Sequence, residues 1–313
     1  MLSRVGERVY WMARYLERVE NTARLINVHT ALLMDLPKQK EINWFTLIKI
    51  FNCEKEYHQQ YERIDEKNIM HFLVADMKNP SSLVQALFYA RENVRTSLDV
   101  LPEEVWEQIN ELNLMVKASL SAIGNRRRRQ NMLLSIMERC LCISGIINNH
   151  MSRNHAYDFI QIGKQIERAD MTSRTLEMTS LLVSNTHSEQ MRKHKGILWG
   201  SLLKAISAQQ MYLHEKRTSI EPDKVLDFLI TDKALPRSLS FSLASIGSYL
   251  KLLPEPEDPL TIQQQILENL NAYRSSNIPP DQTHFFMDSF QMRLMELHQK
   301  ISARWFHPDY EMI

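Results

Sequence analysis

The chain has 313 residues, with 38 Lys and Arg against 37 Asp and Glu, so its formal net charge is +1. This balance excludes a globally basic nucleic-acid-binding protein and an acidic tail protein, because each needs a large excess of one charge. Only seven glycines are present, about 2% where proteins average near 7%. So few glycines exclude the phosphate-binding loops of dinucleotide folds and the tight turns of a β-sandwich. The composition predicts an all-α protein.

Helical segments are predicted in chain order from apolar spacing and capping residues. Apolar residues three and four positions apart indicate a long amphipathic helix from Leu2 to Met34, which ends before Pro37. A second helix is expected after Asn43. Later boundaries are indicated by helix starts at Asn79-Pro80 and Pro102-Glu103-Glu104, and by proline-containing surface loops at 254–259 and Pro279-Pro280.

The cysteines and the amino-terminal residues bear on the cellular compartment. Cys53, Cys140 and Cys142 are too few for a disulfide framework, and the sequence predicts reduced, buried thiols. The segment that follows Met1 is charged and has no apolar signal core. No stretch approaches the roughly 18 consecutive apolar residues of a membrane span. We therefore expect a cytoplasmic protein without a membrane partner.

The sequence also repeats itself. Residues 16–24 reappear as 166–174, an offset of 150. Shorter matches follow in the same order, with 44 and 57 recurring at an offset of 155, the 72–83 block at 156, and the 137–144 block at 158. A slowly drifting offset is typical of a duplication with small loop insertions. We predict a pseudo-twofold helical bundle built by tandem duplication of a unit of about 150 residues. The repeats are approximately 1–148 and 149–313, and the bundle is one domain over 1–313.

Charged residues gather beside the apolar stripe of the first predicted helix. On a helical wheel, one edge holds Glu17, Glu20, Asn21 and Arg24. Glu20 and Arg24 lie four residues apart with the acid first, which is the favourable orientation for an ion pair. The second copy repeats this spacing with Asp170 and Arg174. Both repeats are therefore expected to carry an ion pair along one helix edge.

Two interpretations of these paired motifs remain open. In the structural one, ion pairs brace two facing helices near the centre of the bundle, Glu17 with Arg168 and Glu167 with Arg18. In the functional one, the same side chains line a symmetric polar groove that holds a charged ligand or a partner segment. The sequence alone does not choose between a buried core of salt bridges and an open groove.

Three further charged segments are candidates for binding. One predicted helix has a charged cluster without a clear copy in the second repeat: Arg91, Glu92, Asn93 and Arg95. This cluster is either a binding site or merely a solvated helix face. Arg237 and Ser238 stand at a predicted helix start, where an anion could bind or where the hydroxyl simply begins the helix. The basic run 126–129 is expected to be an exposed turn. Because no aromatic residues are interleaved with it, a nucleic-acid partner is not expected.

The motifs of a self-contained active site are missing from the sequence. It has no repeated Glu-x-x-His, no His-Glu-x-x-His, no nucleophile elbow and no P-loop. We therefore predict no metal and no cofactor. One catalytic alternative stays open, in which Glu17 and Glu167 act as acid and base while arginines clamp an anionic substrate. A purely structural scaffold is the third hypothesis.

The opening segment resembles a known family. Residues 2–5, 10–18 and 20–24 are similar to the start of the bacterial alpha-E proteins, a helical family with a Glu-Arg motif. Residues 90–95, Trp106 and 236–238 also resemble segments of that family. Ala13 and Lys164 stand where Gly and Arg are more typical, and Leu98 replaces an expected Arg.

This resemblance implies an all-α cytoplasmic protein, often encoded beside a circularly permuted ATP-grasp protein and a transglutaminase-like protein. It also implies assistance to ATP-dependent formation of peptide or amide bonds. On this basis we expect an accessory helical module that partners an ATP-grasp-type ligase. The module would bind its partner, or a charged peptide-like ligand, at the Glu-Arg motifs. The sequence is compatible with an oligomer and does not require one.

Overall fold

The computed structural model describes residues 3–36, 42–184, 189–273, 278 and 282–307, without the side chains of 189–194. All regular structure in these ranges is helical, which confirms the predicted all-α class. The helices before residue 151 are α1 Ser3–Asp35, α2 Phe45–Ile50, α3 Glu54–Gln60, α4 Glu66–Met70, η1 His71–Ala75, α5 Leu83–Arg95, α6 Glu103–Ser119, η2 Leu120–Ala122 and α7 Arg126–His150. Those after it are α8 His155–Ser184, α9 Glu189–Ala205, α10 Gln209–Lys216, α11 Pro222–Thr231, α12 Leu239–Leu250, α13 Glu257–Ala272 and α14 Thr283–Trp305.

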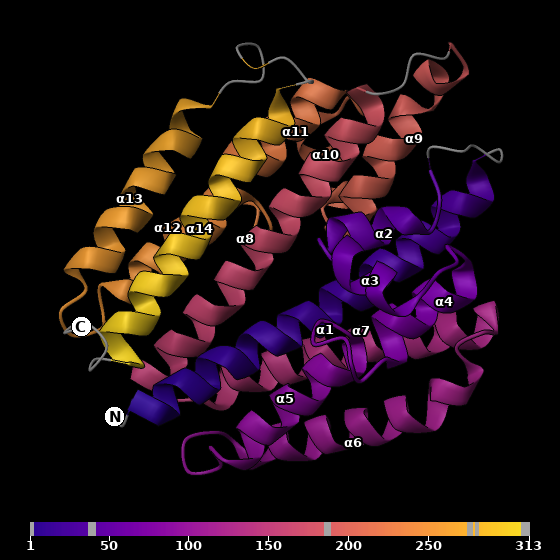
Figure 1. Ribbon diagram of the computed structural model, residues 1–313. Helices are drawn as coiled ribbons and strands as arrows, with labels where there is room; N and C mark the ends of the chain where they lie inside the picture. Colours follow the sequence, from indigo (N-terminus) through magenta and orange to yellow (C-terminus); the bar gives the residue numbers. More distant parts are fainter. Residues whose placement is uncertain (1–2, 37–41, 185–188, 274–277, 279–281, 308–313) are drawn as a thin grey trace.

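The two longest helices, α1 and α8, pack against each other in the middle of the molecule (Figure 1). The predicted first helix is confirmed, but its burial exceeds that of an amphipathic stripe. Every residue from Val19 to Ile26 is buried, and so is every residue from Ala156 to Gly163. A helix buried on all sides must bury its polar residues too, and these need partners inside the protein.

Two groups of helices surround this central pair (Figure 1). In one, α1 packs against α5 and α7, and α6 packs against both of these. In the other, α8 packs against α12 and α14, and α13 packs against both. The short helix α2 contacts α8, while α9 contacts both α1 and α8. None of the helices within the described ranges is both long enough and apolar enough to cross a membrane.

The predicted helix starts are confirmed in part. Helix α6 begins after Pro102 as expected, and Asp76 ends η1. The start at Asn79-Pro80 is wrong, because α5 begins three residues later. There the Ser82 hydroxyl accepts a hydrogen bond from the Gln85 amide at 3.2 Å. The Asn79 side chain is used elsewhere, since its amide donates to the Phe72 carbonyl at 2.9 Å.

Two predictions about side-chain exposure also need correction. The 126–129 run is the first turn of α7, not a turn between helices, and Arg129 is buried against Glu66 at 2.6 Å. Cys53 and Cys140 are buried as predicted, whereas Cys142 is exposed. The loop predicted at Pro279-Pro280 and the proline at 37 lie outside the described residues.

One glycine sets the distance between the central helices. A Cβ atom added to Gly163 of α8 would collide with the backbone carbonyl oxygen of Tyr10 on α1. Backbone atoms cannot move aside as a flexible side chain can, so a larger residue forces the helices apart. The close approach also brings the charged residues of α1 and α8 within reach of each other.

The substitution Gly163→Ala tests this contact. We expect it to lower the free energy of unfolding by about 1–3 kcal/mol, because the overpacked methyl group displaces α1 from α8. The matched control is Gly145→Ala in α7, where an added Cβ meets no atom within 4 Å. There the better helix propensity of alanine should raise the stability by up to about 1 kcal/mol. Chemical denaturation followed by circular dichroism measures both, and equal effects would contradict the proposed close contact.

Candidate functional site

Two reciprocal ion pairs join α1 to α8 at the centre of the molecule. Arg168 donates to Glu17 through two nitrogens, Nε to Oε1 at 2.9 Å and Nη2 to Oε2 at 3.0 Å. Arg18 binds Glu167 in the same way, Nε to Oε1 at 2.5 Å and Nη2 to Oε2 at 3.1 Å. These are the two cross-pairs that the sequence predicted. Paired donors matched to both carboxylate oxygens make this the strongest form of ion pair.

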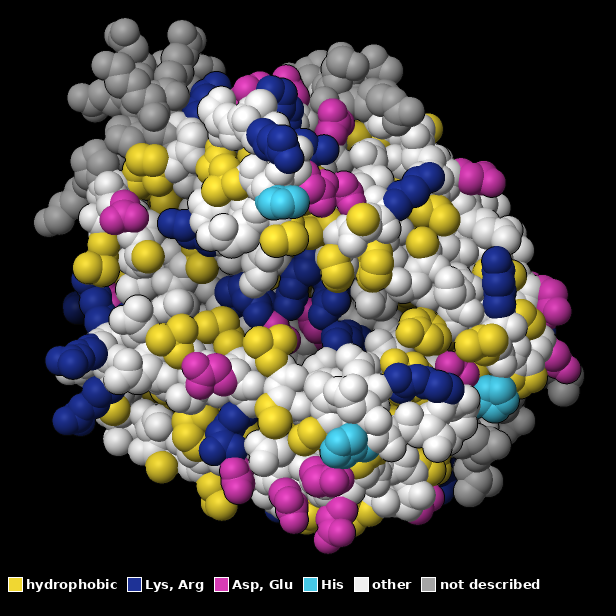
Figure 2. All heavy atoms as spheres, turned by 180° about the vertical axis from the view of Figure 1, so that it is seen from behind, with side chains coloured by type: hydrophobic (Ala, Val, Ile, Leu, Met, Phe, Trp, Pro, Cys, Tyr) yellow, Lys and Arg dark blue, Asp and Glu magenta, His cyan; other side chains and the backbone are white. Residues whose placement is uncertain are grey.

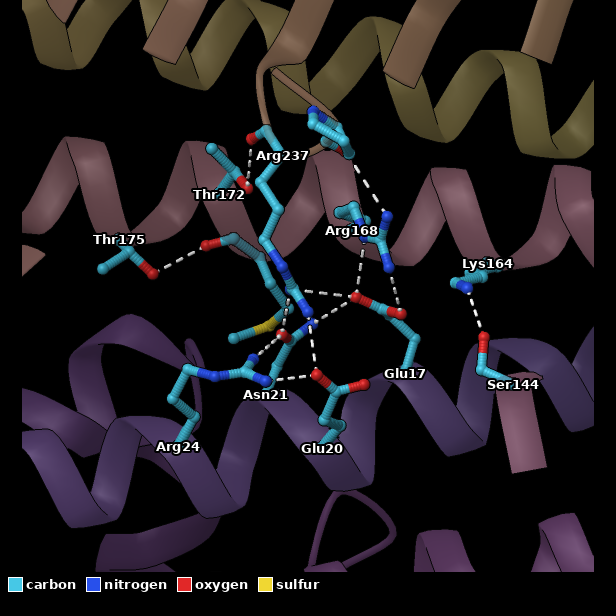
Figure 3. A network of polar contacts seen from close by, with 12 residues as sticks. Glu17, Glu20, Asn21, Arg24, Ser144, Lys164, Arg168, Thr172, Thr175 and Arg237 are labelled. Carbon is cyan, nitrogen blue, oxygen red and sulfur yellow. Dashed lines mark hydrogen bonds and ion pairs between the residues drawn. The ribbon is translucent and has the colours of Figure 1, made fainter. Parts of the chain in front are cut away.

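Arg237 extends the network on the Glu17 side. It precedes α12, and its side chain reaches down between α8 and α1 (Figure 3). Its guanidinium donates to Glu17 at 3.1 Å, to the Asn21 side-chain oxygen at 2.9 Å and to Glu20 at 2.8 Å. Arg24 also binds Glu20, as the i,i+4 spacing predicted. The structure therefore brings together all four residues of the first predicted cluster and the distant Arg237.

The Glu167 side is built differently. Arg14 donates to Glu167 at 2.9 Å beside Arg18, and Arg174 binds Asp170 at 2.9 Å, as predicted. The residue 156 positions before Arg237, the offset of the predicted repeat, is Ser81, which is too short to act as a second clamp. The two sides of the network are thus unequal.

Both central carboxylates are ionised. Glu17 is 3% exposed and Glu167 is 1% exposed, and burial alone would raise the pKa of each. The opposing arginines dominate: Arg168 and Arg237 hold the pKa of Glu17 well below its usual range. Arg18 and Arg14 lower the pKa of Glu167 to about 2. Neither carboxyl can serve as a proton donor near neutral pH.

Lys164 brings a further positive charge to the Glu17 side. Its Nζ donates to the Ser144 hydroxyl at 2.6 Å (Figure 3). Burial lowers the pKa of this ammonium, and the nearby Arg168 lowers it further. Lys164 lines a small cavity of about 30 Å³ together with Glu17 and Glu20. This volume has room for about one small group such as a water molecule.

The Glu17 side holds more positive charge than negative charge. Its cations are Arg24, Lys164, Arg168 and Arg237, and its anions are Glu17 and Glu20. Burial lowers the pKa of Arg237, and the neighbouring Arg168 and Arg24 add to this effect although the guanidinium stays charged. We call these six residues the basic hollow. The molecule seen from behind has a hollow near its middle, in which Lys and Arg side chains gather beside acidic ones (Figure 2).

The other predicted site residues lie apart from this network. Arg91, Glu92 and Arg95 pair with one another along α5, and Arg91 also donates to Asn110 of α6 at 2.7 Å. The Arg91 guanidinium covers the Trp106 ring at 4.9 Å. Asn93 lies on the same helix, and its backbone carbonyl accepts a hydrogen bond from the Thr96 hydroxyl at 3.3 Å. Ser238 caps α12, since its hydroxyl accepts from the Phe241 amide at 3.0 Å.

Sequence analysis missed three members of the site. Arg14 stands one helical turn before Arg18, so the spacing contained a signal that it shares the same face. Lys164 likewise stands one turn before Arg168. Ser144 carried no such signal, because its role depends on α7 packing beside α8. The described residues contain no group of three or more His, Cys, Asp or Glu able to hold a metal ion.

Comparison with protein families matches this geometry to a known description. Residues 1–306 match the family described as a predicted alpha-helical domain with a conserved ER motif. The chain belongs to the alpha-E family. The Glu-Arg pairs at 17–18 and 167–168 are those that exchange partners between the two central helices.

Relatives of this alpha-E chain occur in mycobacteria. An uncharacterized protein of Mycobacterium tuberculosis is 23% identical over 323 residues, and one of Mycobacterium bovis is 22% identical over 320 residues. Each match covers 96% of this chain but 35% of the relative. The chain thus spans about a third of the length of these curated relatives. No solved structure matches it.

The low pKa of Glu167 predicts acid sensitivity. A carboxyl whose pKa is depressed in the folded state contributes stability above its unfolded pKa and loses that contribution as pH falls through the folded value. We therefore expect the free energy of unfolding to fall between about pH 4.5 and pH 2. Urea denaturation at a series of pH values measures this slope.

The variant Glu167→Gln isolates this effect. It should cost about 3–5 kcal/mol at pH 7, because Arg14 and Arg18 lose their buried partner, and its stability should depend less on pH in the acidic range. Glu104→Gln, which alters a half-exposed pair with His150, serves as the control and should leave both quantities nearly unchanged. An unaltered acid slope in Glu167→Gln would contradict the assignment.

Proposed function

We propose that the chain is an accessory binding module that works beside an ATP-grasp-type ligase in peptide or amide bond metabolism. Its basic hollow would receive an acidic group, either from a peptide-like substrate or from the partner. The supporting observation is the charge of the hollow, where four cations surround two carboxylates. A buried excess of positive charge is costly, and an incoming carboxylate would offset that cost.

Binding is favoured over catalysis by the state of the central carboxylates. Glu17 and Glu167 are ionised, and each is fixed by two arginines, so neither is poised to exchange a proton. Cys140 lies beside the hollow, but burial raises the pKa of its thiol well above the usual value, which disfavours a nucleophilic thiolate. An enzyme that uses these carboxylates as acid and base is therefore the weaker alternative.

A scaffold without a ligand is the other alternative, and burial of the cross-pairs favours it. The ion pairs alone account for a fixed register between α1 and α8. They do not account for Arg237 and Lys164, which add charge that the two carboxylates do not balance. This surplus is the reason that we favour a binding function.

The tandem duplication belongs to the same proposal. In its favour, each half of the described chain begins with one long helix and ends with three helices, of which two pack on the long helix and the third packs on those two. The reciprocal exchange of partners between Glu17-Arg18 and Glu167-Arg168 is what a pseudo-twofold axis between two copies would produce. We accordingly treat residues 1–313 as one domain.

The length of the relatives supports a module that acts with other polypeptide. About two thirds of each mycobacterial relative lies outside the matched region, so in those proteins the alpha-E part is joined to further sequence. The proposed partners are an ATP-grasp-type ligase and a transglutaminase-like protein. The proposed location is the cytoplasm, where ATP is available to the ligase. Self-association is compatible with this function, and neither nucleic acid nor membrane takes part in it.

Co-purification tests the partnership. The full chain, expressed together with an ATP-grasp-type ligase from the same genome, should form a complex that survives size-exclusion chromatography. Absence of a complex both with and without ATP and Mg²⁺ would contradict the partnership. The scaffold alternative predicts that Glu17→Gln lowers thermal stability without a change in binding. The enzyme alternative predicts an activity of the isolated chain that a folded Glu17→Gln variant lacks.

The variant Arg237→Ser tests the ligand. It introduces the residue found at the matching position of the first repeat, and Glu17 and Glu20 keep Arg168 and Arg24 as partners, so the fold should persist. The probe is a short blocked peptide whose one charge is a glutamate carboxylate. Its affinity, measured by calorimetry, should fall about 10- to 100-fold, as expected from the loss of a charged hydrogen bond. The control is the same blocked peptide with glutamine in place of glutamate. Equal binding of both peptides would contradict the proposed anion site.

A further inference from the structure

A second cavity lies away from the basic hollow, between α1, α7 and α9. Its volume is about 760 Å³, within the range of pockets that hold small molecules. None of its lining residues belongs to the basic hollow.

The charge around this cavity is strongly positive. Its lining has four cations, Arg126, Arg127, Arg129 and Lys204, against the single carboxylate of Asp35. Glu66 stands behind Arg126 and Arg129 and pairs with both at 2.6 Å. Arg127 and Lys204 are exposed, and no acidic side chain of the described chain pairs with either. Two cations from different helices are thus left facing a cavity large enough for a ligand.

The start of α7 adds to this positive potential. A helix has a partial positive charge at its N-terminus and is usually stabilised there by Asp or Glu. Helix α7 has no acidic residue in its first turn and begins with arginines instead. The sequence therefore places like charges together beside the cavity. A bound anion would reduce the repulsion between them.

A smaller cavity occupies the matching place in the other half. It measures about 270 Å³, and its lining residues come from the α2 region, from α8 and from α14. Lys204 of the large cavity and Lys49 of the small one stand 155 residues apart, an offset of the sequence repeat. The comparison of the two cavities rests on the tandem duplication proposed above.

Three matched positions differ in charge in the same direction. The large cavity has the amides Asn27, Gln209 and Gln130, and the small one has the carboxylates Glu177, Glu54 and Asp288. Their offsets of 150, 155 and 158 are those of the repeat. Each exchange replaces a neutral amide by a carboxylate, and the Gln209/Glu54 pair does so at equal side-chain length. One cavity thus has neutral polar groups and arginines where the other has carboxylates.

We propose that the cavity between α1, α7 and α9 binds a small soluble molecule that carries a phosphate or carboxylate group on an aliphatic body. Arg127 and Lys204 would hold the anionic group. The apolar lining is aliphatic and includes Val28, Leu133 and Ile197. None of the described lining residues is aromatic, so the cavity offers no ring for stacking a nucleobase.

Calorimetry with octyl phosphate tests this site in the full chain. The native chain should bind it, and should bind octanol and inorganic phosphate at least 10-fold more weakly. The double variant Gln130→Glu/Gln209→Glu introduces at these two positions the negative charges of the small cavity. It should lower the affinity for octyl phosphate at least 10-fold. Gln264→Glu/Gln299→Glu makes the same charge change at exposed positions outside the cavity and should bind like the native chain.

A second variant acts through volume. An added Cβ at Gly196 meets no atom within 4 Å, so Gly196→Leu should fold normally, place a side chain in the cavity and weaken binding. Equal affinity in the two double variants, or octanol bound as tightly as octyl phosphate, would overturn the proposal. So would binding to phosphatidic acid vesicles but not to octyl phosphate. All these variants leave Arg237 and the basic hollow intact, so the ligase partnership and the carboxylate peptide are tested separately.

Discussion

The register between α1 and α8 depends on two buried carboxylates whose bidentate arginine partners lie on the opposite helix. Glu17 binds Arg168 of α8, and Glu167 binds Arg18 of α1. A slip of one helical turn moves the side chains about 5.4 Å along the axis, which would break both bidentate pairs. Apolar contacts tolerate such a shift far better, because one aliphatic side chain can replace another. The ion pairs therefore select one register among several that hydrophobic packing would accept.

Much of this arrangement could be predicted from the sequence because it is encoded locally. The scarcity of glycine indicated the all-α class, and the repeated spacing of Glu17-Arg18 and Glu167-Arg168 indicated that the two motifs meet. What could not be predicted depends on tertiary contacts. Asn79 and Ser82 are both good capping residues, and the choice between them follows from the Phe72 carbonyl that engages Asn79.

The environment of charged side chains was harder to predict than the helices, both for single arginines and for the net charge of a cluster. The arginine run looked solvated, yet Arg129 is buried because Glu66 lies beside it, 63 residues away in the sequence. The excess charge of the basic hollow arises from Arg237, Lys164 and Arg24, which come from the turn before α12, from α8 and from α1. Local patterns show which residues can pair, whereas the balance of charge in a cluster is fixed only by the complete fold. For this protein that balance carries the functional argument.

The reciprocal cross-pairs have a consequence for the ancestry of the fold. A single unit of half this length would bury a glutamate and an arginine on its long helix without internal partners. Two separate copies of it could satisfy both residues by meeting face to face about a twofold axis, in the isologous contact typical of homodimers. In the proposed duplication, fusion of the two genes would then free each copy to vary alone, and the difference between Arg237 and Ser81 is in keeping with such change. On this view the core of the chain is a former subunit interface.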